Sequence, residues 1–159
     1  ESDIELLFAT PVQPGKYVVL FTGSIEDLRS ALRRGAEVAR GDLVDQLLIP
    51  QVEAGVCEAL RRQGQPLPDG ELDAVGVVET TTVAASILAA DIALKEASVD
   101  LLDLRVANGL GGKSFLTITG EVSDVRSSVQ AAAGSAESSG RLARHVVIPR
   151  PHPELSAHL

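Results

Sequence analysis

The sequence carries one pattern twice, and this duplication constrains the fold more than any other feature. Four segments of the first half recur in the second half, in the same order and at offsets of 95 to 99 residues. The matched pairs are Ile4–Leu7 with Val99–Leu102, Pro14–Lys16 with Gly111–Lys113, Thr22–Arg29 with Thr119–Arg126, and Ile49–Pro50 with Ile148–Pro149. Such a long offset indicates a duplicated domain and not a short solenoid repeat. Duplicated domains without an evident reaction centre are more often parts of an assembly than enzymes.

The second half predicts a complete α+β unit. Apolar runs and helically spaced apolar residues predict, in order, a strand over 74–79, a helix over 83–96, strands over 99–107 and 113–119, a helix over 122–138, a strand over 141–148 and a helical turn within 154–159. Thr80, Thr81 and Thr82 are candidate N-caps of the first helix. This order is typical of the split βαβ (ferredoxin-like) fold, an antiparallel sheet with helices on one face.

The first half predicts the same order from its second strand onward. We expect strands over 4–10 and 16–22, a helix over 25–39, a strand over 43–49 and a closing helix over 52–62. No counterpart of residues 74–95 precedes them. The first strand of a split βαβ sheet lies in the interior, and its loss leaves backbone amides unpaired, which is costly. We therefore expect the chain to begin inside a longer native protein. A half-open first domain is the alternative.

Composition narrows the function classes. Aromatic residues make up only 3% of the chain, so the core must consist of Val, Leu, Ile and Ala. The formal net charge of −8 argues against nucleic acid as a partner, because phosphate binding needs clustered Lys and Arg. Cys57 is the single cysteine, which excludes a disulfide or a multi-cysteine metal site within one chain. No apolar run approaches the ~20 residues that span a bilayer. No base is paired with a nucleophile, so we expect no catalytic residue, no metal and no cofactor.

Five separated segments of the second half resemble the bacterial microcompartment shell domain. They are Ala74–Thr80, Ala89–Lys95, Gly109–Lys113, Thr119–Val122 and Ile148–His152. The first half resembles the same domain more loosely, through Pro14–Tyr17, Thr22–Gly23 and Ile49–Pro50. The predicted organisation is a first shell domain over 1–63 that lacks its first strand and helix, a linker rich in Pro and Gly over 64–73, and a second shell domain over 74–159. Below, these two domains are called the first unit and the second unit.

The resemblance extends to tandem-domain shell proteins and implies an assembly. In that family, three chains form a flat disc with pseudo-sixfold symmetry and a central pore for metabolites. The disc tiles beside hexameric and pentameric shell proteins of a cytoplasmic microcompartment and walls off a set of enzymes. The expected partners are thus two further copies, other shell proteins and the encapsulated enzymes, with no nucleic acid and no membrane.

The resemblance assigns the pore lining to two loops. They are Val12, Gln13, Pro14 and Gly15 in the first unit, and Asn108, Gly109, Leu110, Gly111 and Gly112 in the second. Relatives of the propanediol-utilisation type carry cysteine at the position of Gln13, and three copies hold an iron–sulfur cluster. Glutamine is a poor iron ligand, so we expect a polar pore without a cluster. A plain hairpin loop is the simpler interpretation of the first loop. The glycine-rich loop could equally be a flexible turn or an anion-binding concavity of backbone N–H groups.

The resemblance also places Lys95, Arg150 and His152 at the disc edge. Lys95 would pack against its symmetry mate in the next disc. The alternative is a solvated lysine near a helix C-terminus, where the helix dipole favours a positive charge. Arg150 stands between two prolines, which hold it on a rigid arm, and its guanidinium suits carbonyl capping across an interface. The alternative for Arg150 is a C-terminal turn without a partner. The matching stretch Pro50–Glu53 has neither Arg nor His, so the two kinds of edge are not equivalent.

Two functional hypotheses remain. The first is a structural shell protein with a pore. The second is a small-molecule or cofactor-binding module at a subunit junction, with the glycine-rich loop as its site. An enzyme that uses scattered carboxylates fits least.

Overall fold

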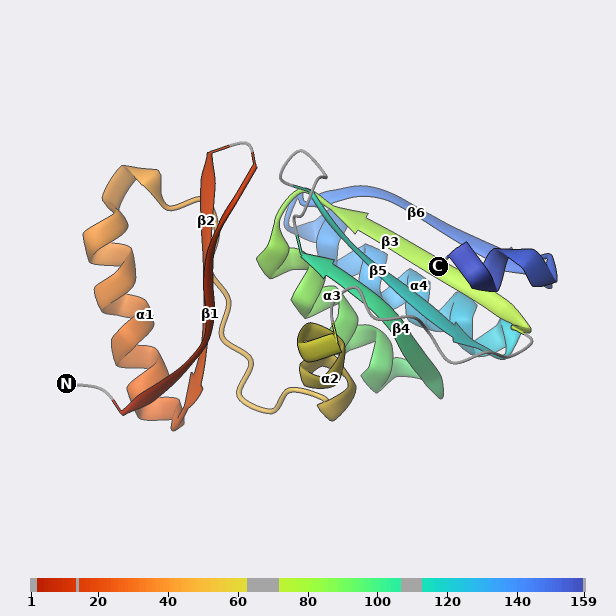
Figure 1. Cartoon of the computed structure of the whole chain (residues 1–159), viewed down its shortest axis with the longest axis horizontal. Helices are drawn as coiled ribbons and strands as arrows, with labels where there is room; N and C mark the ends of the chain where they lie inside the picture. The colour runs from red at the N-terminus through yellow and green to blue at the C-terminus, as the bar shows by residue number, and fades with distance from the viewer. Residues whose placement is uncertain (1–2, 14, 63–71, 107–112, 159) are drawn as a thin grey trace.

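The second unit forms a four-stranded antiparallel sheet with two helices on one face (Figure 1). The computed structural model describes residues 3–13, 15–62, 72–106 and 113–158. The elements of this unit are β3 (Ala74–Thr80), α3 (Val83–Glu96), β4 (Val99–Val106), β5 (Ser114–Gly120), α4 (Val122–Ser138), β6 (Leu142–Pro149) and the 3-10 helix η2 (Pro153–His158). The strand order β4-β5-β3-β6 puts β3 in the interior, which confirms the predicted split βαβ fold.

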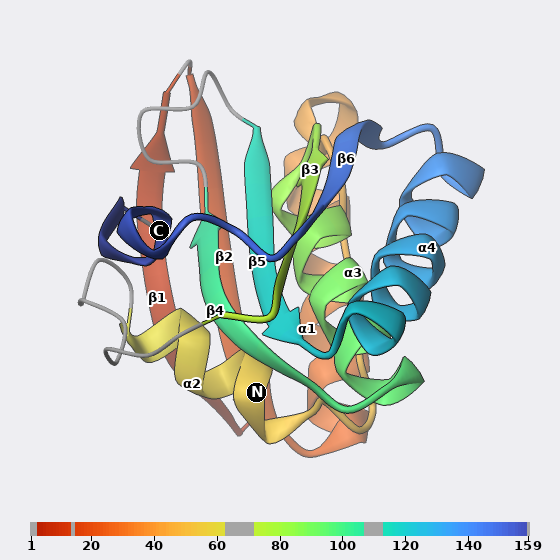
Figure 2. The same ribbon diagram turned by 90° about the vertical axis from the view of Figure 1, so that its right-hand side faces the viewer.

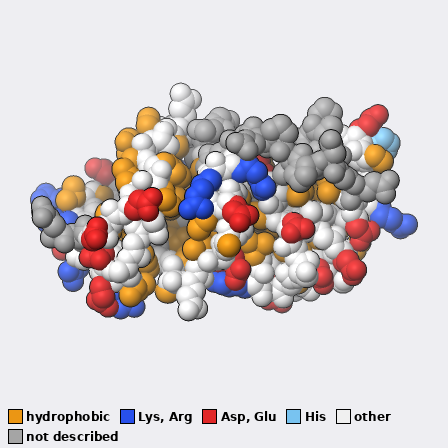
Figure 3. All heavy atoms as spheres, turned by 60° about the horizontal axis from the view of Figure 1, so that its bottom comes forward, with side chains coloured by type: hydrophobic (Ala, Val, Ile, Leu, Met, Phe, Trp, Pro, Cys, Tyr) orange, Lys and Arg blue, Asp and Glu red, His pale blue; other side chains and the backbone are white. Residues whose placement is uncertain are grey.

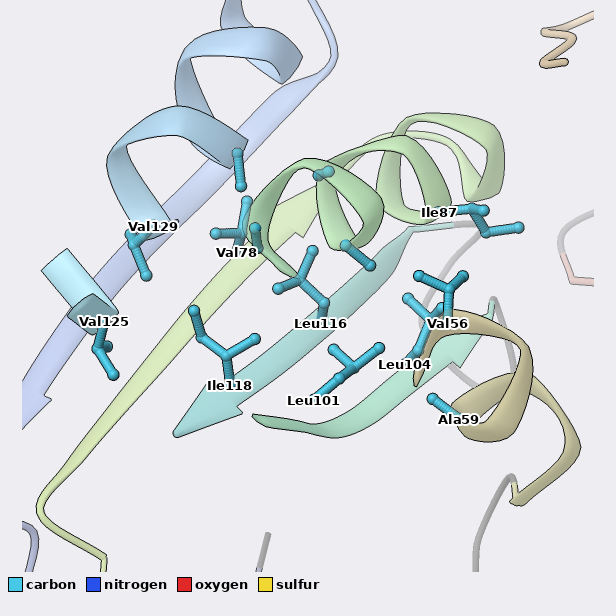
Figure 4. Close-up of a cluster of buried hydrophobic side chains, with 14 of the residues drawn as sticks. Val56, Ala59, Val78, Ile87, Leu101, Leu104, Leu116, Ile118, Val125 and Val129 are labelled. Atoms are coloured by element: carbon cyan, nitrogen blue, oxygen red, sulfur yellow. The ribbon is translucent and has the colours of Figure 1, made fainter. Parts of the chain in front are cut away.

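The core of the second unit lies between the sheet and its helices (Figure 4). Leu104, Leu116 and Ile118 are fully buried, and each such side chain contributes about 1.5–3 kcal/mol through burial. The helix α4 approaches β3 closely because Gly76 has no side chain. A Cβ atom there would lie 2.5 Å from Cγ2 of Val129. At the start of α3, Thr82 Oγ1 accepts a hydrogen bond from the Ala85 N–H at 3.2 Å, so the predicted N-cap is confirmed.

The first unit begins with a hairpin and a helix. Its elements are β1 (Ile4–Val12), β2 (Lys16–Gly23), α1 (Ile25–Ala39), the 3-10 turn η1 (Arg40–Asp42) and α2 (Ala54–Arg62). The pairing of β1 with β2 shifts register between Leu6 and Phe8, and the pairing of β4 with β5 shifts between Leu101 and Asp103. These irregularities occupy the same place in the repeat. The structure therefore confirms the duplication down to a local distortion of the strand.

The predicted strand over 43–49 is wrong. Within the described residues, this segment pairs with no strand, whereas the matching strand β6 pairs with β3. The physical reason is the missing partner, because the described part of the first unit holds no counterpart of β3. The segment instead contacts the second unit. Asp45 Oδ2 accepts a hydrogen bond from Thr82 Oγ1 at 2.5 Å, and the Val44 carbonyl accepts one from Arg141 Nη2 at 3.2 Å.

The helix α2 belongs to the first unit by sequence but packs against the second. Val56 and Ala59 are buried in the same apolar cluster as Leu104 and Ile87. Figures 1 and 2 show α2 beside β4, between the first hairpin and the second sheet. Nη2 of Arg62 donates to the carbonyls of Leu101 and Leu102, at 2.9 and 3.0 Å, where the register of β4 shifts. The two units are thus joined by an apolar contact and by hydrogen bonds to the backbone.

Candidate functional site

The register of the second sheet separates the two sets of candidate residues. Pairing aligns two rows across the strands, Val99, Gly120, Ala74 and Pro149 at one end and Val106, Ser114, Thr80 and Leu142 at the other. A seven-residue strand spans about 23 Å at ~3.3 Å per residue. The connection from β4 to β5 leaves from the second row, whereas Lys95 and Arg150 lie next to the first. The strand ends that precede and follow the candidate pore loop therefore lie at the opposite end of the sheet from Lys95 and Arg150.

The first hairpin turn is described at Val12, Gln13 and Gly15. Val12 is buried, Gln13 is exposed, and Gly15 has a φ of +68°, a conformation that glycine adopts without steric cost. Pro14 and the whole second loop, Asn108 to Gly112, lie outside the described residues. The assignment of these nine residues to a pore therefore remains a prediction.

The loop-bearing ends of the two hairpins lie near each other. Thr10 of β1 and Val106 of β4 line the same hollow of about 470 Å³, together with Cys57 and Leu60 of α2. In Figures 1 and 2, the turn end of the β1–β2 hairpin and the first residues of β5 point toward the same side of the molecule. Cys57 is half-buried in this hollow. The described strand residues Thr10 and Val106, which precede the two candidate pore loops in the sequence, thus lie at one hollow.

Charged side chains near the loop end of the second sheet were missed by the sequence reasoning. Lys113 Nζ lies 3.2 Å from Glu79 Oε1, and Arg105 Nη2 lies 3.0 Å from Asp103 Oδ2. The Arg105 guanidinium also stands 5.2 Å from the centroid of the Phe115 ring. These residues occupy the sheet face away from α3 and α4. The alternation of apolar and charged residues along the strands is the signal that could have found them.

Lys95 is anchored within the chain as well as exposed. Its Nζ atom lies 2.6 Å from Asp91 Oδ2 and donates to the Gln51 carbonyl at 2.6 Å, while 41% of its side chain remains exposed. The other carboxylate oxygen of Asp91 accepts from the Glu53 N–H at 2.8 Å. The pairing of Asp91 with Lys95 follows from their spacing of four residues on one helix. The contact with residues 51–53 joins segments far apart in the sequence, so no local pattern could reveal it.

Arg150 has a strained backbone and a free side chain. Its φ of +48° lies in the left-handed region, which costs a non-glycine residue about 1–2 kcal/mol. The Arg150 N–H donates to the Asp73 carbonyl at 2.7 Å, which helps to hold this turn. The guanidinium is exposed and makes no hydrogen bond or ion pair with the described residues. Strained turns of this kind are often retained where a side chain must be aimed at a partner.

His152 is exposed, and its Nδ1 atom accepts from the Glu154 N–H at 3.3 Å. Arg150 and Lys95 both lie at the same end of the sheet, but beside opposite outer strands, β6 and β4. The structure therefore does not gather the three edge candidates into one cluster.

The described part of the chain holds no group of three or more His, Cys, Asp or Glu side chains placed to bind a metal ion. None of its helices is both long enough and apolar enough to cross a membrane.

Comparisons with known proteins place both units in one family. Residues 1–52 and 74–151 match the model of the BMC domain. The bacterial microcompartment shell protein PduT of Citrobacter freundii is 38% identical over 151 residues, which cover 95% of this chain and 80% of PduT. The bacterial microcompartment shell protein EutM of Escherichia coli is 33% identical over 84 residues, which cover 53% of this chain and 84% of EutM. A crystal structure of a microcompartment protein from Desulfitobacterium hafniense has a TM-score of 0.84 at 40% identity, covering 97% of this chain and 84% of that one.

Proposed function

Because the chain belongs to the BMC domain family and is a structural shell protein and not an enzyme, we propose that three copies close into a pseudo-hexameric disc with a central pore. The disc would tile the shell of a bacterial microcompartment beside other shell proteins. The observation that carries this proposal is the contact between the two units of one chain.

That contact is head-to-tail. The end of the first unit meets the flank of the second through Asp45 on Thr82, Glu53 on Asp91 and Arg62 on Leu101. The two surfaces differ, so the contact is heterologous. Repetition of a heterologous contact produces a closed ring or an open filament. In the proposed ring, a similar contact runs from the second unit of one copy to the first unit of the next, so that three chains would close six similar units. Leu6 is the counterpart of Leu101 in that contact, whereas the described first unit holds no counterpart of Thr82 or Asp91.

The sheet register supports a pore at the end of the sheet where β4 ends and β5 begins, and contacts between discs at the opposite end. In a ring, the loop-bearing ends of both units face the axis, and Val12, Gln13, Pro14 and Gly15 line the pore together with Asn108 to Gly112. Three exposed Gln13 amides give an uncharged ring of donors and acceptors, which suits the passage of small polar metabolites. Lys95, Arg150 and His152 then lie at the rim, where they contact neighbouring discs.

The decisive experiment measures distances between copies. Nitroxide labels are attached to Gln13→Cys or Arg150→Cys in a Cys57→Ser background, after the trimer mass is established by sedimentation equilibrium. We expect a short, single label distance for position 13 and a much longer one for position 150. A monomer at shell-forming concentrations contradicts the ring. A label distance that is shorter at position 150 than at position 13 would place residue 150 nearer the axis and residue 13 nearer the rim, the reverse of the proposal.

Tiling is tested separately by Lys95→Ala and Arg150→Ala, with Lys113→Ala as the matched control at a charged site away from the rim. We expect both rim variants to weaken the formation of extended sheets, seen by electron microscopy, while the trimer and the control remain intact. Loss of the trimer in either rim variant would mean that the residue lies between the copies of one trimer and not between neighbouring discs.

A further inference from the structure

A row of mostly charged side chains crosses the sheet of the second unit on the face away from its helices. Gly76 faces α4, because a Cβ atom there would meet Val129 and Val125. Side chains alternate along a strand, so Glu79, three positions later, lies on the opposite face. Residues paired across strands share a face, and the register extends this charged row through all four strands as Arg105, Phe115, Glu79 and Arg144.

Cations outnumber carboxylates around the charged row. Lys113 pairs with Glu79, and Arg105 pairs with Asp103. Arg144 is exposed and has no ion pair or side-chain hydrogen bond with the described residues, although it lies opposite Glu79 in the register. The chain as a whole has a net charge of −8, and Figure 3 shows acidic side chains along the whole length of the molecule. A local excess of positive charge on this face is therefore an exception.

The two carboxylates hold two of the cations in place and leave the third free. Asp103 and the ring of Phe115 together orient the Arg105 guanidinium, which remains half exposed. The Lys113 side chain is also half exposed. The guanidinium of Arg144 engages none of its five N–H donors with the described residues. Such a planar fork of donors matches the oxygens of a carboxylate or a phosphate group.

Apolar surface and an unpaired hydroxyl adjoin these charges. The next row on the same face consists of Asp103, Thr117, Val77 and Val146. Val146 is 44% exposed beside Arg144. Thr117 is only 2% exposed, yet its hydroxyl has no hydrogen-bond partner among the described residues. Polar groups on nearly buried side chains are normally paired, so this hydroxyl is a ready contact for a polar group of a ligand.

We propose that this face of the second unit binds a small organic anion with an apolar body. The carboxylate or phosphate group of the ligand lies between Arg144 and Lys113. Its apolar body covers Phe115 and Val146. Strands β5 and β6 lie two strand spacings apart, about 10 Å, which matches the length of a small metabolite. All contacts come from the second unit, so the proposal does not rest on the proposed ring.

The test titrates the intact chain with phenyl phosphate at low ionic strength and follows the NMR shifts of backbone amides. Phenylacetate replaces the phosphate with a carboxylate, inorganic phosphate lacks the apolar body, and benzyl alcohol lacks the charge. We expect saturable shifts at residues 77–79, 113–117 and 144–146. At least one aromatic anion should bind about tenfold more tightly than inorganic phosphate and benzyl alcohol, because only it makes both kinds of contact. The tighter of the two anions identifies the preferred headgroup.

Matched variants separate this site from general charge attraction. Arg144→Gln should weaken binding of the tighter anion about tenfold, whereas Arg126→Gln, at an exposed arginine of α4, should not. Glu79→Gln should tighten binding about threefold, because it removes a like charge beside the anion. Glu137→Gln makes the same change in net charge at an exposed position of α4 and should have no effect.

Three results would overturn the proposal. Equal weakening by Arg144→Gln and Arg126→Gln would mean that only the overall charge attracts the anion. Weaker binding by Glu79→Gln would mean that the face prefers cations. The absence of saturable shifts, or shifts confined to residues 108–112, would place no anion on this face. The sedimentation mass of each variant reports separately on the trimer, so failure of this site is distinguishable from failure of the ring.

Discussion

The described first unit has no counterpart of β3 and α3, and this difference from the second unit shows what these two elements do in the fold. In the second unit, β3 pairs with β5 and β6 and provides Gly76 as the contact surface for α4. In the described first unit, β2 has one partner, residues 43–49 have none, and no residue of α1 is buried. Equivalent residues therefore pack or remain exposed according to the presence of an interior strand.

The sharpest contrast is between Leu116 and Val19, which occupy the same place in the repeat. We expect Leu116→Ala to lower the free energy of unfolding by about 3 kcal/mol, because the side chain is fully buried and leaves a cavity. Val19→Ala should cost less than about 0.5 kcal/mol, since the side chain is half exposed. Urea denaturation of both variants measures the difference. Equal losses of unfolding free energy in the two variants would mean that Val19 is as well packed as Leu116.

The next test concerns the contact that the first unit lacks. In Gly76→Ala, the new methyl group meets Val129 and Val125 at 2.5 and 2.9 Å, and overpacking of this kind costs about 2 kcal/mol. Thermal unfolding followed by circular dichroism gives the change in Tm. A neutral result would place α4 farther from β3 than it lies in this structure.

Asp91 connects the two units, so its removal should act on both. Its side chain is 5% exposed and accepts from Glu53 and Lys95. We expect Asp91→Ala to cost about 1.5 kcal/mol, because the Glu53 N–H loses its partner. Glu37→Ala, at an exposed ion pair with Arg34, is the control and should cost under about 0.5 kcal/mol. Hydrogen exchange at Glu53 should accelerate only in the first variant.

The smallest effect is expected where the units are alike. Gly35 in α1 and Gly134 in α4 both have open space at the Cβ position. Replacement of either by Ala should stabilise the chain by about 0.5–1 kcal/mol, because alanine favours the helix. Chemical denaturation tests this, and a gain in only one unit would show that the two helices differ in more than their burial.

Local patterns in the sequence predicted most elements, and their order predicted the sheet of the second unit, but the contacts between the two units were not predicted. The helices over 25–39, 83–96 and 122–138 are confirmed at both ends, because caps and apolar spacing act within one segment. The strand over 43–49 is wrong because a strand also needs a neighbour, which no local pattern can supply. The closing helix begins at Ala54 and not at residue 52. Just before its start, the Glu53 N–H is bound by Asp91 of the other unit.

The features of the candidate site also divide into those that local sequence predicts and those that depend on distant segments. The rigid arm of Arg150 between two prolines was predicted, and Arg150 is exposed. The pairing of Asp91 with Lys95 was not predicted, although their spacing of four residues on one helix allows it. The contact of Lys95 with Gln51 and the left-handed backbone of Arg150 could not be predicted from local patterns. Both depend on how distant segments meet.

The alignment of the strand ends has a consequence for how the permeability of the proposed shell can evolve. Variation in loop length at one end of the sheet leaves the opposite end, about 23 Å away along the strands, where it was. In the proposed disc, mutations in the pore loops would therefore alter permeability without shifting the spacing between neighbouring discs. A shell built from such discs would acquire new selectivity while its lattice stays the same.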